Sequence, residues 1–177
     1  QLVEQSSGRF IQVAGKQYLN FASNDYLGFS DGFIEIQAQQ LGSHSSALVN
    51  GYNKPQQQLE QRLYELLGYE SAMLFNSGFS ANSSVLKALF QDKSVAKSSA
   101  IFQDKLNHAS LIDGIQSSPA QLMRFRHNDI QHLSQLLKKY AHQYESVLIV
   151  CESVYSMDGD EAPIHDIIDL KTRYNAT

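Results

Sequence analysis

Three polar segments of the sequence each follow an apolar run and carry side chains able to bind an anion or to move a proton. The first, residues 76–82, leads into a helical pattern, where backbone N–H groups and the positive end of the helix dipole would converge on a phosphate. Gly78 would let the backbone approach that anion, and Ser77 or Ser80 would add a hydroxyl. The alternative is a turn that only caps the helix. The segment has neither a Walker A nor a G-x-G-x-x-G pattern, which disfavours a nucleotide-binding module.

The other two segments, residues 103–110 and 151–160, place further reactive side chains after strands. The imidazole of His108 stands at a strand-to-helix junction. There it would stack on a flat cofactor or exchange a proton, unless it is an ordinary surface histidine. Glu152 stands at the end of a buried strand, where its carboxylate requires a partner.

The sequence predicts no metal site. Asp158 and Asp160 suggest a calcium loop, but the ladder of oxygen ligands at alternate positions does not continue. The histidines show no metal-ligand spacing, and a paired zinc motif is absent from the sequence.

Composition places these segments in one globular unit. The chain has 177 residues, 42% of them hydrophobic, which is enough for one sizeable core. Its net charge of -4 and its scattered basic residues disfavour a nucleic-acid or membrane-surface binder. The single cysteine, Cys151, forms no internal disulfide, and no signal peptide or long apolar run is present, so we expect a cytoplasmic protein that acts on small molecules. The sequence begins without methionine and ends without a helix stop, so we expect part of a longer protein.

Apolar periodicity predicts the elements that must hold these segments. The N-terminal part predicts a hairpin over residues 9–13 and 17–21, then a loop over 22–53 with one weak helix near 34–41. Short apolar runs predict strands at 72–75, 100–102, 121–125 and 147–150, and helical patterns cover 55–67, 80–90, 109–115, 130–140 and 163–174. Strands that alternate with helices indicate an α/β fold with a largely parallel sheet, in which ligands bind at the carboxyl ends of the strands.

Four segments in combination resemble a known family. Residues 21–28 (FASNDYLG), 77–79 (SGF) with Asn82, 107–110 (NHAS) and 152–163 (ESVYSMDGDEAP) occur in the order and approximate spacing seen in the α-oxoamine synthases. These are pyridoxal-phosphate (PLP) enzymes of fold type I. The resemblance covers nearly the whole chain. It implies a partial large domain of the type I PLP-dependent transferase fold, with a mostly parallel sheet and flanking helices.

The resemblance also implies roles for single residues. Ser77, Gly78 and Phe79 match the positions that hold the phosphate of PLP and its neighbourhood. His108 matches the imidazole that stacks on the pyridine ring and contacts the substrate. Ser156 matches the hydroxyl near the phenolic oxygen of PLP.

The implied reaction joins an amino acid to an acyl thioester with loss of carbon dioxide, and Asn24 matches the side chain that helps to hold the amino-acid carboxylate. Residues 152–163 favour the member that condenses L-alanine with a pimeloyl thioester, of CoA or acyl carrier protein, in biotin synthesis. 5-Aminolevulinate synthase, glycine C-acetyltransferase and a non-catalytic scaffold that keeps the fold stay open as alternatives. The full-length protein is expected to be a homodimer.

The resemblance divides the chain into a hairpin and substrate loop, residues 1–30, and an incomplete PLP-binding large domain, residues 31–177. Family members continue into an Asp-x-x-His segment and a Ser/Thr-x-x-Lys segment, whose lysine forms the Schiff base with PLP. Neither follows Thr177, so we expect this chain alone to be inactive.

Three positions depart from the family pattern. His44 and Ala47 stand where glycine is expected, or arginine at the second, and Gln56 stands where histidine is common. The first two affect the geometry of the loop, because a non-glycine residue resists positive φ.

Overall fold

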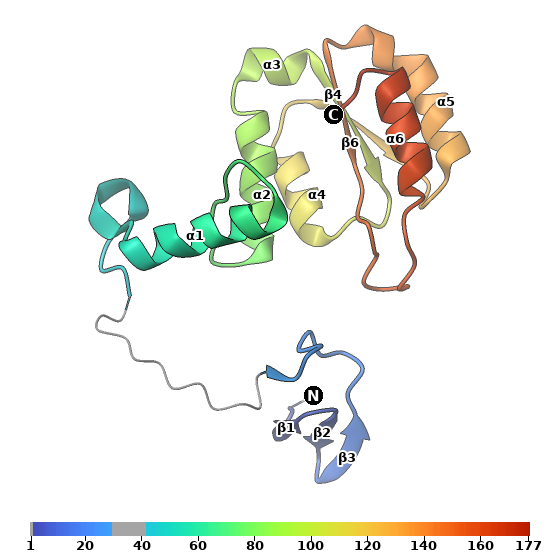
Figure 1. Ribbon diagram of the computed structural model, residues 1–177. Coiled ribbons are helices and arrows are strands. Elements are labelled where there is room, and N and C mark those ends of the chain that lie inside the picture. The colour runs from blue at the N-terminus through green and yellow to red at the C-terminus, as the bar shows by residue number, and fades with distance from the viewer. Residues whose placement is uncertain (1, 30–41) are drawn as a thin grey trace. The chain divides into compact units, whose positions relative to one another are not determined.

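The computed structural model describes residues 2–29 and 42–177. The chain separates into two compact units, Gln1–Asn53 and Lys54–Thr177, and each is considered by itself (Figure 1). The division expected after residue 30 and the helix expected near residues 34–41 lie outside the described residues.

The first unit contains a small antiparallel sheet in the order β1-β2-β3, formed by β1 (Gln5–Ser7), β2 (Phe10–Val13) and β3 (Lys16–Leu19). The predicted hairpin is confirmed as β2 and β3. Its turn holds Ala14 and Gly15 at φ of 50° and 69°, the left-handed pair that a two-residue hairpin turn uses. The sequence did not predict β1, because Gln-Ser-Ser carries no apolar alternation.

The loop that precedes the second unit includes a short π-helical turn, η2 (Ala47–Gly51), capped by the Ser46 side chain. His44 has a φ of 59°, so it adopts the left-handed conformation that glycine adopts at less cost. Gly51 is required, because a Cβ there would lie 1.9 Å from the Ser45 carbonyl oxygen.

The second unit begins with α1 (Lys54–Leu67), as the leucine spacing predicts. Gly68 ends it with a φ of 73°, and the Tyr69 N–H donates to the Tyr64 carbonyl at 2.9 Å, which is the Schellman arrangement. The apolar stripe of α1 is not fully covered within the described residues, since Leu66 is 78% exposed.

The strand predicted over residues 72–75 is wrong, because this run is irregular in the structure. A strand needs a neighbour for its backbone N–H and C=O groups, and no strand of the described residues pairs with it. The Leu74 N–H instead donates to the Glu60 carboxylate of α1 at 3.0 Å. An apolar run of this length carries no information about its partner.

The second unit is built on a parallel sheet of order β5-β4-β6, formed by β4 (Ser99–Asp104), β5 (Gln121–Phe125) and β6 (Ser146–Val150). Each strand matches a predicted one, and β4 pairs in parallel with both neighbours. The carboxyl ends of these strands therefore meet at one edge of the sheet, which we call the carboxyl edge.

Helices connect the strands, as predicted for an α/β fold. α4 (Ala109–Gln116) joins β4 to β5, α5 (Ile130–Tyr140) and the short η3 (Ala141–Gln143) join β5 to β6, and α6 (Ile164–Arg173) follows β6. After α6 the chain returns to the sheet, where the Thr177 N–H donates to the Val147 carbonyl at 2.9 Å.

Helices cover both faces of the sheet (Figure 1). Side chains of β4 alternate between the two faces. Ala100 and Phe102 belong to the core under α5 and α6, whereas Ile101 belongs to the core under α2 (Gly78–Leu89), α3 (Lys93–Lys97) and α4. The three residues are fully buried, so β4 is the central strand of the unit. The sequence did not predict α3, which is too short to show a helical period.

α2 packs closely on α4. Gly114 permits the approach, because a Cβ there would lie 2.8 Å from the Leu86 Cβ and 3.1 Å from the Ser83 Cα. The Ser83 hydroxyl donates to the Asp113 carboxylate at 2.6 Å, and the Lys87 ammonium lies 3.0 Å from the same oxygen. The hydrogen bond from Ser83 and then the charge of Lys87 lower the pKa of Asp113.

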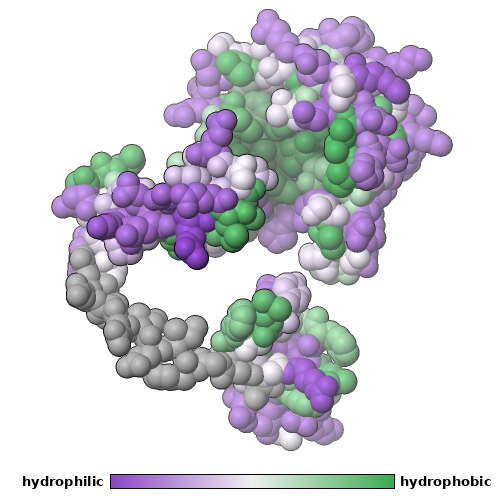
Figure 2. Space-filling model, in the orientation of Figure 1, coloured by the Kyte–Doolittle hydropathy of each residue, from purple (hydrophilic) through white to green (hydrophobic). Residues whose placement is uncertain are grey.

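Apolar side chains reach the surface of both units (Figure 2). Phe21 and Leu48 of the first unit are 92% and 98% exposed, and Met157 of the second is 91% exposed. Exposed apolar surface of this kind favours association with further polypeptide. Within the described residues, every helix is too short or too polar to cross a membrane.

Candidate active site

The N-terminus of α2 forms the first part of the candidate site. The Ser77 side chain caps the helix and accepts from the Ser80 N–H at 3.1 Å. No acceptor within the described residues engages the N–H groups of Gly78 and Phe79, the first two residues of the helix. A Cβ at Gly78 would meet no atom within 4 Å, so the space beside these donors is open. This arrangement suits an anion.

His108 caps α4 at the carboxyl edge. Its Nδ1 accepts from the Ser110 main-chain N–H at 3.2 Å and lies 2.7 Å from the Ser110 hydroxyl. A main-chain N–H can only donate, so we infer that Nδ1 carries the lone pair and that the proton of the neutral ring sits on Nε2.

A second contact orients the same ring from α2. The Asn82 amide donates to the Ser110 hydroxyl at 3.0 Å, and Ser110 is fully buried. Because that hydroxyl already accepts from Asn82, its own hydrogen is free to point at His108 Nδ1. The imidazole is thus held by both helices, and its Nε2–H is left for a bound molecule.

The first two parts of the site lie side by side. The Phe79 and His108 rings meet edge to face, with centroids 6.4 Å apart and planes at 74°. The His108 main-chain N–H also donates to the Glu152 carboxylate, from the loop after β6. The His108 main-chain N–H is thus the partner that the sequence predicts for the Glu152 carboxylate.

Ser156 lies on the loop between β6 and α6, which we call the β6 loop (residues 151–163). A bridge between Val154 and Glu161 closes this loop, and the Tyr155 N–H donates to the Asp160 carbonyl at 2.9 Å. Ser156 makes no hydrogen bond to the other candidate residues within the part of the chain that the structure describes. Its role stays a prediction.

Asn24 belongs to the first unit and is described only there. Its side-chain oxygen accepts from the Tyr26 hydroxyl at 3.4 Å, and both residues are exposed. The role of Asn24 therefore also stays a prediction.

The sequence analysis missed a polar cluster at the same edge, centred on His127. One ring nitrogen of His127 lies 2.9 Å from Asp104 and the other 2.8 Å from Asp160. Asn128 donates to both carboxylates, through its main-chain N–H and its side-chain amide. The His127 ring also packs edge to face on Tyr155. His127 itself could have been singled out from the sequence, since it follows β5 as His108 follows β4.

The hydrogen bonds of this cluster favour the charged forms of His127 and Asp160. Burial opposes the charge on His127, but the hydrogen bonds to Asp104 and Asp160 outweigh it and raise the pKa of the ring. Burial also opposes the charge on Asp160, yet its bonds to His127 and Asn128 hold the pKa of that carboxyl below its usual range. Burial raises the pKa of the Tyr155 hydroxyl. The cluster therefore favours a charged imidazole between two carboxylates.

One group near this cluster has the composition of a metal site. His127, Asp158 and Asp160 offer ligand atoms that lie within 4.8 Å of one another. Both ring nitrogens of His127 are already engaged by carboxylates, and a ring that carries two protons has no lone pair for a metal. The cluster is therefore better explained by hydrogen bonding.

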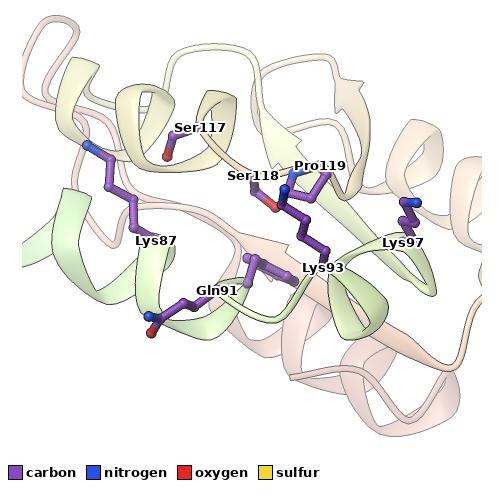
Figure 3. A pocket seen from close by; sticks show the side chains of 8 residues that line it. Lys87, Gln91, Lys93, Lys97, Ser117, Ser118 and Pro119 are labelled. Carbon is purple, nitrogen blue, oxygen red and sulfur yellow. The ribbon is translucent and has the colours of Figure 1, made fainter.

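A hollow of about 780 Å³ in the surface of the second unit lies away from these residues (Figure 3). Lys87, Lys93, Lys97 and the turn at Ser117 and Ser118 line it, near the ends of α2 and α4. Lys87 and Lys97 lie in the last turns of α2 and α3, where a positive charge is favourable at the negative end of the helix dipole, so these two lysines need no ligand to explain them. The candidate site lies instead at the carboxyl edge of the sheet.

Comparison with known proteins identifies the family of the chain. The chain matches the family described as aminotransferase class I and II over residues 16–177. It is 45% identical, over 99% of its length, to the 8-amino-7-oxononanoate synthase of Aliivibrio fischeri strain MJ11, and it covers 46% of that protein. The chain thus spans about half the length of the curated relatives it matches.

Solved structures share the fold. Serine palmitoyltransferase from S. paucimobilis, determined with a PLP-myriocin adduct, matches with a TM-score of 0.83 at 26% identity, covering 99% of this chain and 45% of that one. An 8-amino-7-oxononanoate synthase from Francisella tularensis matches with a TM-score of 0.53 at 33% identity, covering 67% and 32%. The chain therefore belongs to the aminotransferase class I and II family and, within it, to the α-oxoamine synthases, PLP-dependent enzymes of fold type I.

Proposed function

We propose that the complete gene product carrying this sequence condenses L-alanine with a pimeloyl thioester, of CoA or acyl carrier protein, to give 8-amino-7-oxononanoate and carbon dioxide for biotin synthesis. The observation that carries the proposal is the 45% identity, over 99% of the chain, to an enzyme of that name. The serine palmitoyltransferase of the same fold is only 26% identical, which favours L-alanine with a pimeloyl thioester over the substrates of that enzyme.

The residues at the carboxyl edge fit PLP, an aromatic ring that bears a phosphate. The free N–H groups of Gly78 and Phe79, with the Ser77 hydroxyl beside them, suit the phosphate at the positive end of α2. Bound PLP would supply an electron sink for the bond changes at the amino-acid Cα.

The other candidate residues act around that ring in this proposal. His108 would cover the pyridine face and offer its Nε2–H to the substrate, because Ser110 occupies Nδ1. Ser156 would hold the phenolic oxygen of PLP, and Asn24 would help to hold the carboxylate of the amino acid. These assignments come from the family pattern, and the fixed ring of His108 supports the first of them.

A lysine that anchors PLP is not assigned within this chain. Lys87, in the Ser84-Val85-Leu86-Lys87 segment, pairs with Asp113 on the α2 and α4 contact and is half exposed. We infer that this chain alone is inactive. The complete gene product is inferred to be a cytoplasmic homodimer, for which the exposed apolar surface of α1 offers contact area.

The substrate assignment is tested by a panel. The complete gene product is loaded with PLP and given L-alanine, glycine or L-serine, each with pimeloyl-CoA, acetyl-CoA, succinyl-CoA or palmitoyl-CoA, and products are identified by mass spectrometry. L-Alanine with pimeloyl-CoA should give the highest kcat/KM. Preference for glycine with succinyl-CoA or acetyl-CoA would assign 5-aminolevulinate synthase or glycine C-acetyltransferase instead. PLP binding without turnover of any pair would favour the scaffold.

A further inference from the structure

The polar cluster around His127 joins three loops that leave the carboxyl edge of the sheet. Asp104 ends β4, His127 and Asn128 follow β5, and Asp160 belongs to the β6 loop. None of the roles assigned above uses these residues. We propose that His127 is a positioning residue, which rests on the proposed function: by bridging Asp104 and Asp160 it holds the β6 loop, with Ser156, against the turn that carries His108.

The Asp104 carboxylate controls the turn that leads to His108. One of its oxygens accepts from the Leu106 N–H at 2.8 Å, and the Asp104 carbonyl accepts from the Asn107 N–H at 3.3 Å. The Asp104 side chain is fully buried and is therefore unable to turn toward solvent. A change in the position of this carboxylate must shift the backbone just before His108.

The Asp160 carboxylate controls the β6 loop in the same way. The main chain of Asp160 accepts from the Tyr155 N–H at 2.9 Å, so the residue closes the turn that contains Ser156. Asn128 donates to the Asp160 carboxylate at 2.7 Å and to the Glu161 carbonyl at 3.2 Å. Asn128 and His127 therefore hold the end of the tip at Asp160, and the His127 ring packs on Tyr155 at its other end.

Electrostatics makes His127 hard to replace in this position. It faces Asp104 from β4, and Tyr155, Asp158 and Asp160 from the β6 loop. A charged ring balances the two carboxylates that it bridges, whereas a neutral ring donates to only one of them.

The hold of His127 on the β6 loop should depend on pH, because it requires a charged ring and a charged Asp160 carboxylate. The raised pKa of His127 means that its contribution is fully present below the ordinary value of about 6.5 and is lost as pH rises through the raised value. At low pH the contribution is lost again, as Asp160 is protonated below its lowered pKa. The loop should therefore loosen on the alkaline side.

Two variants test the proposal in the complete gene product. His127→Phe keeps an aromatic ring on Tyr155 and removes both bridging bonds, and His127→Gln keeps a donor without a charge. Ile115→Ala is the matched control, since it removes a buried side chain of α4 from the other core, to which the β6 loop does not contribute.

The first readout is amide hydrogen exchange at pH 6, which needs neither PLP nor substrate. Exchange in residues 153–161 should be at least tenfold faster in both His127 variants and unchanged in Ile115→Ala. Equal exchange in the wild type and both His127 variants would overturn the proposal. So would equal acceleration in Ile115→Ala, because it would show a general loss of stability.

The second readout is the pH profile of kcat with saturating substrates. The wild type should lose kcat as pH rises through the pKa of His127, and this alkaline limb should be absent from His127→Gln, whose kcat is at least tenfold lower near pH 6. An unchanged limb in that variant would contradict the proposal. If the wild type does not turn over, the proposed function fails separately, and hydrogen exchange alone decides whether His127 holds the loop.

Discussion

Replacing Gly114 with alanine tests how closely α2 and α4 must approach to form the site. The added Cβ would lie 2.8 Å from the Leu86 Cβ and 3.1 Å from both the Cα and the carbonyl oxygen of Ser83. Backbone atoms cannot move aside as the tip of a flexible side chain does, so the helices must separate. Overpacking of this kind costs about 1–3 kcal/mol, and the better helix propensity of alanine opposes it by about 1 kcal/mol. The net expectation is a loss of up to about 2 kcal/mol.

Urea denaturation of the complete gene product measures this change, with Gln116→Ala as the control at an exposed position of the same helix. The control should alter the free energy of unfolding by less than about 0.5 kcal/mol. PLP affinity should also fall in Gly114→Ala, because Ser77–Phe79 and His108 stand on the two separated helices. A gain of about 1 kcal/mol, as expected at an unhindered helical glycine, would refute the reasoning.

Two further changes follow from the same structure. Ser110→Ala removes a fully buried hydroxyl that accepts from Asn82 and lies 2.7 Å from His108 Nδ1; it should lower the free energy of unfolding by about 1–3 kcal/mol. Its kcat should fall less than about tenfold, since the main-chain N–H of residue 110 still fixes the tautomer, and a much larger fall would show that the hydroxyl does so. His44→Gly should raise the melting temperature, because relief of the left-handed backbone at φ of 59° outweighs the added freedom of the unfolded chain. An unchanged or lower melting temperature for His44→Gly would show that the loop tolerates histidine without strain.

Much of the second unit follows from the sequence. β4 reads as a buried apolar run, and the stripe of residues 130–140 gives α5 with Asp129 as its cap, because local periodicity decides both. Residues 72–75 show the limit of such predictions, since the same kind of run forms no strand where no strand of the described residues pairs with it. Strand pairing is a long-range property, which a local pattern does not contain.

In the candidate site, too, local patterns could be predicted and long-range contacts could not. The place of His108 could be predicted, because it follows a strand of the parallel sheet at the edge where the carboxyl ends meet. The start of α2 at Ser77–Phe79 could be predicted from the helical pattern that follows it, although the run before it forms no strand. The position of His127 after β5 could also be predicted, but its contacts with Asp104 and Asp160 could not, since the three residues lie far apart in sequence and the contacts depend on how three loops fold back. The hydrogen bond from Asn82 of α2 to the Ser110 hydroxyl beside His108 could not be predicted either, because it depends on the close packing of α2 on α4 at Gly114.

The central claim is that the N-terminus of α2 binds the phosphate of PLP, and Gly78→Asp tests it most directly. The new side chain fits, because the space beside Gly78 is open, and a carboxylate in the first turn favours the helix by about 0.3–1 kcal/mol. The same carboxylate would repel a phosphate at that position. The dissociation constant for PLP, measured by absorbance titration of the complete gene product, should therefore rise at least tenfold while the melting temperature of the apoprotein is unchanged or higher. An unchanged dissociation constant would place the phosphate elsewhere and contradict the account.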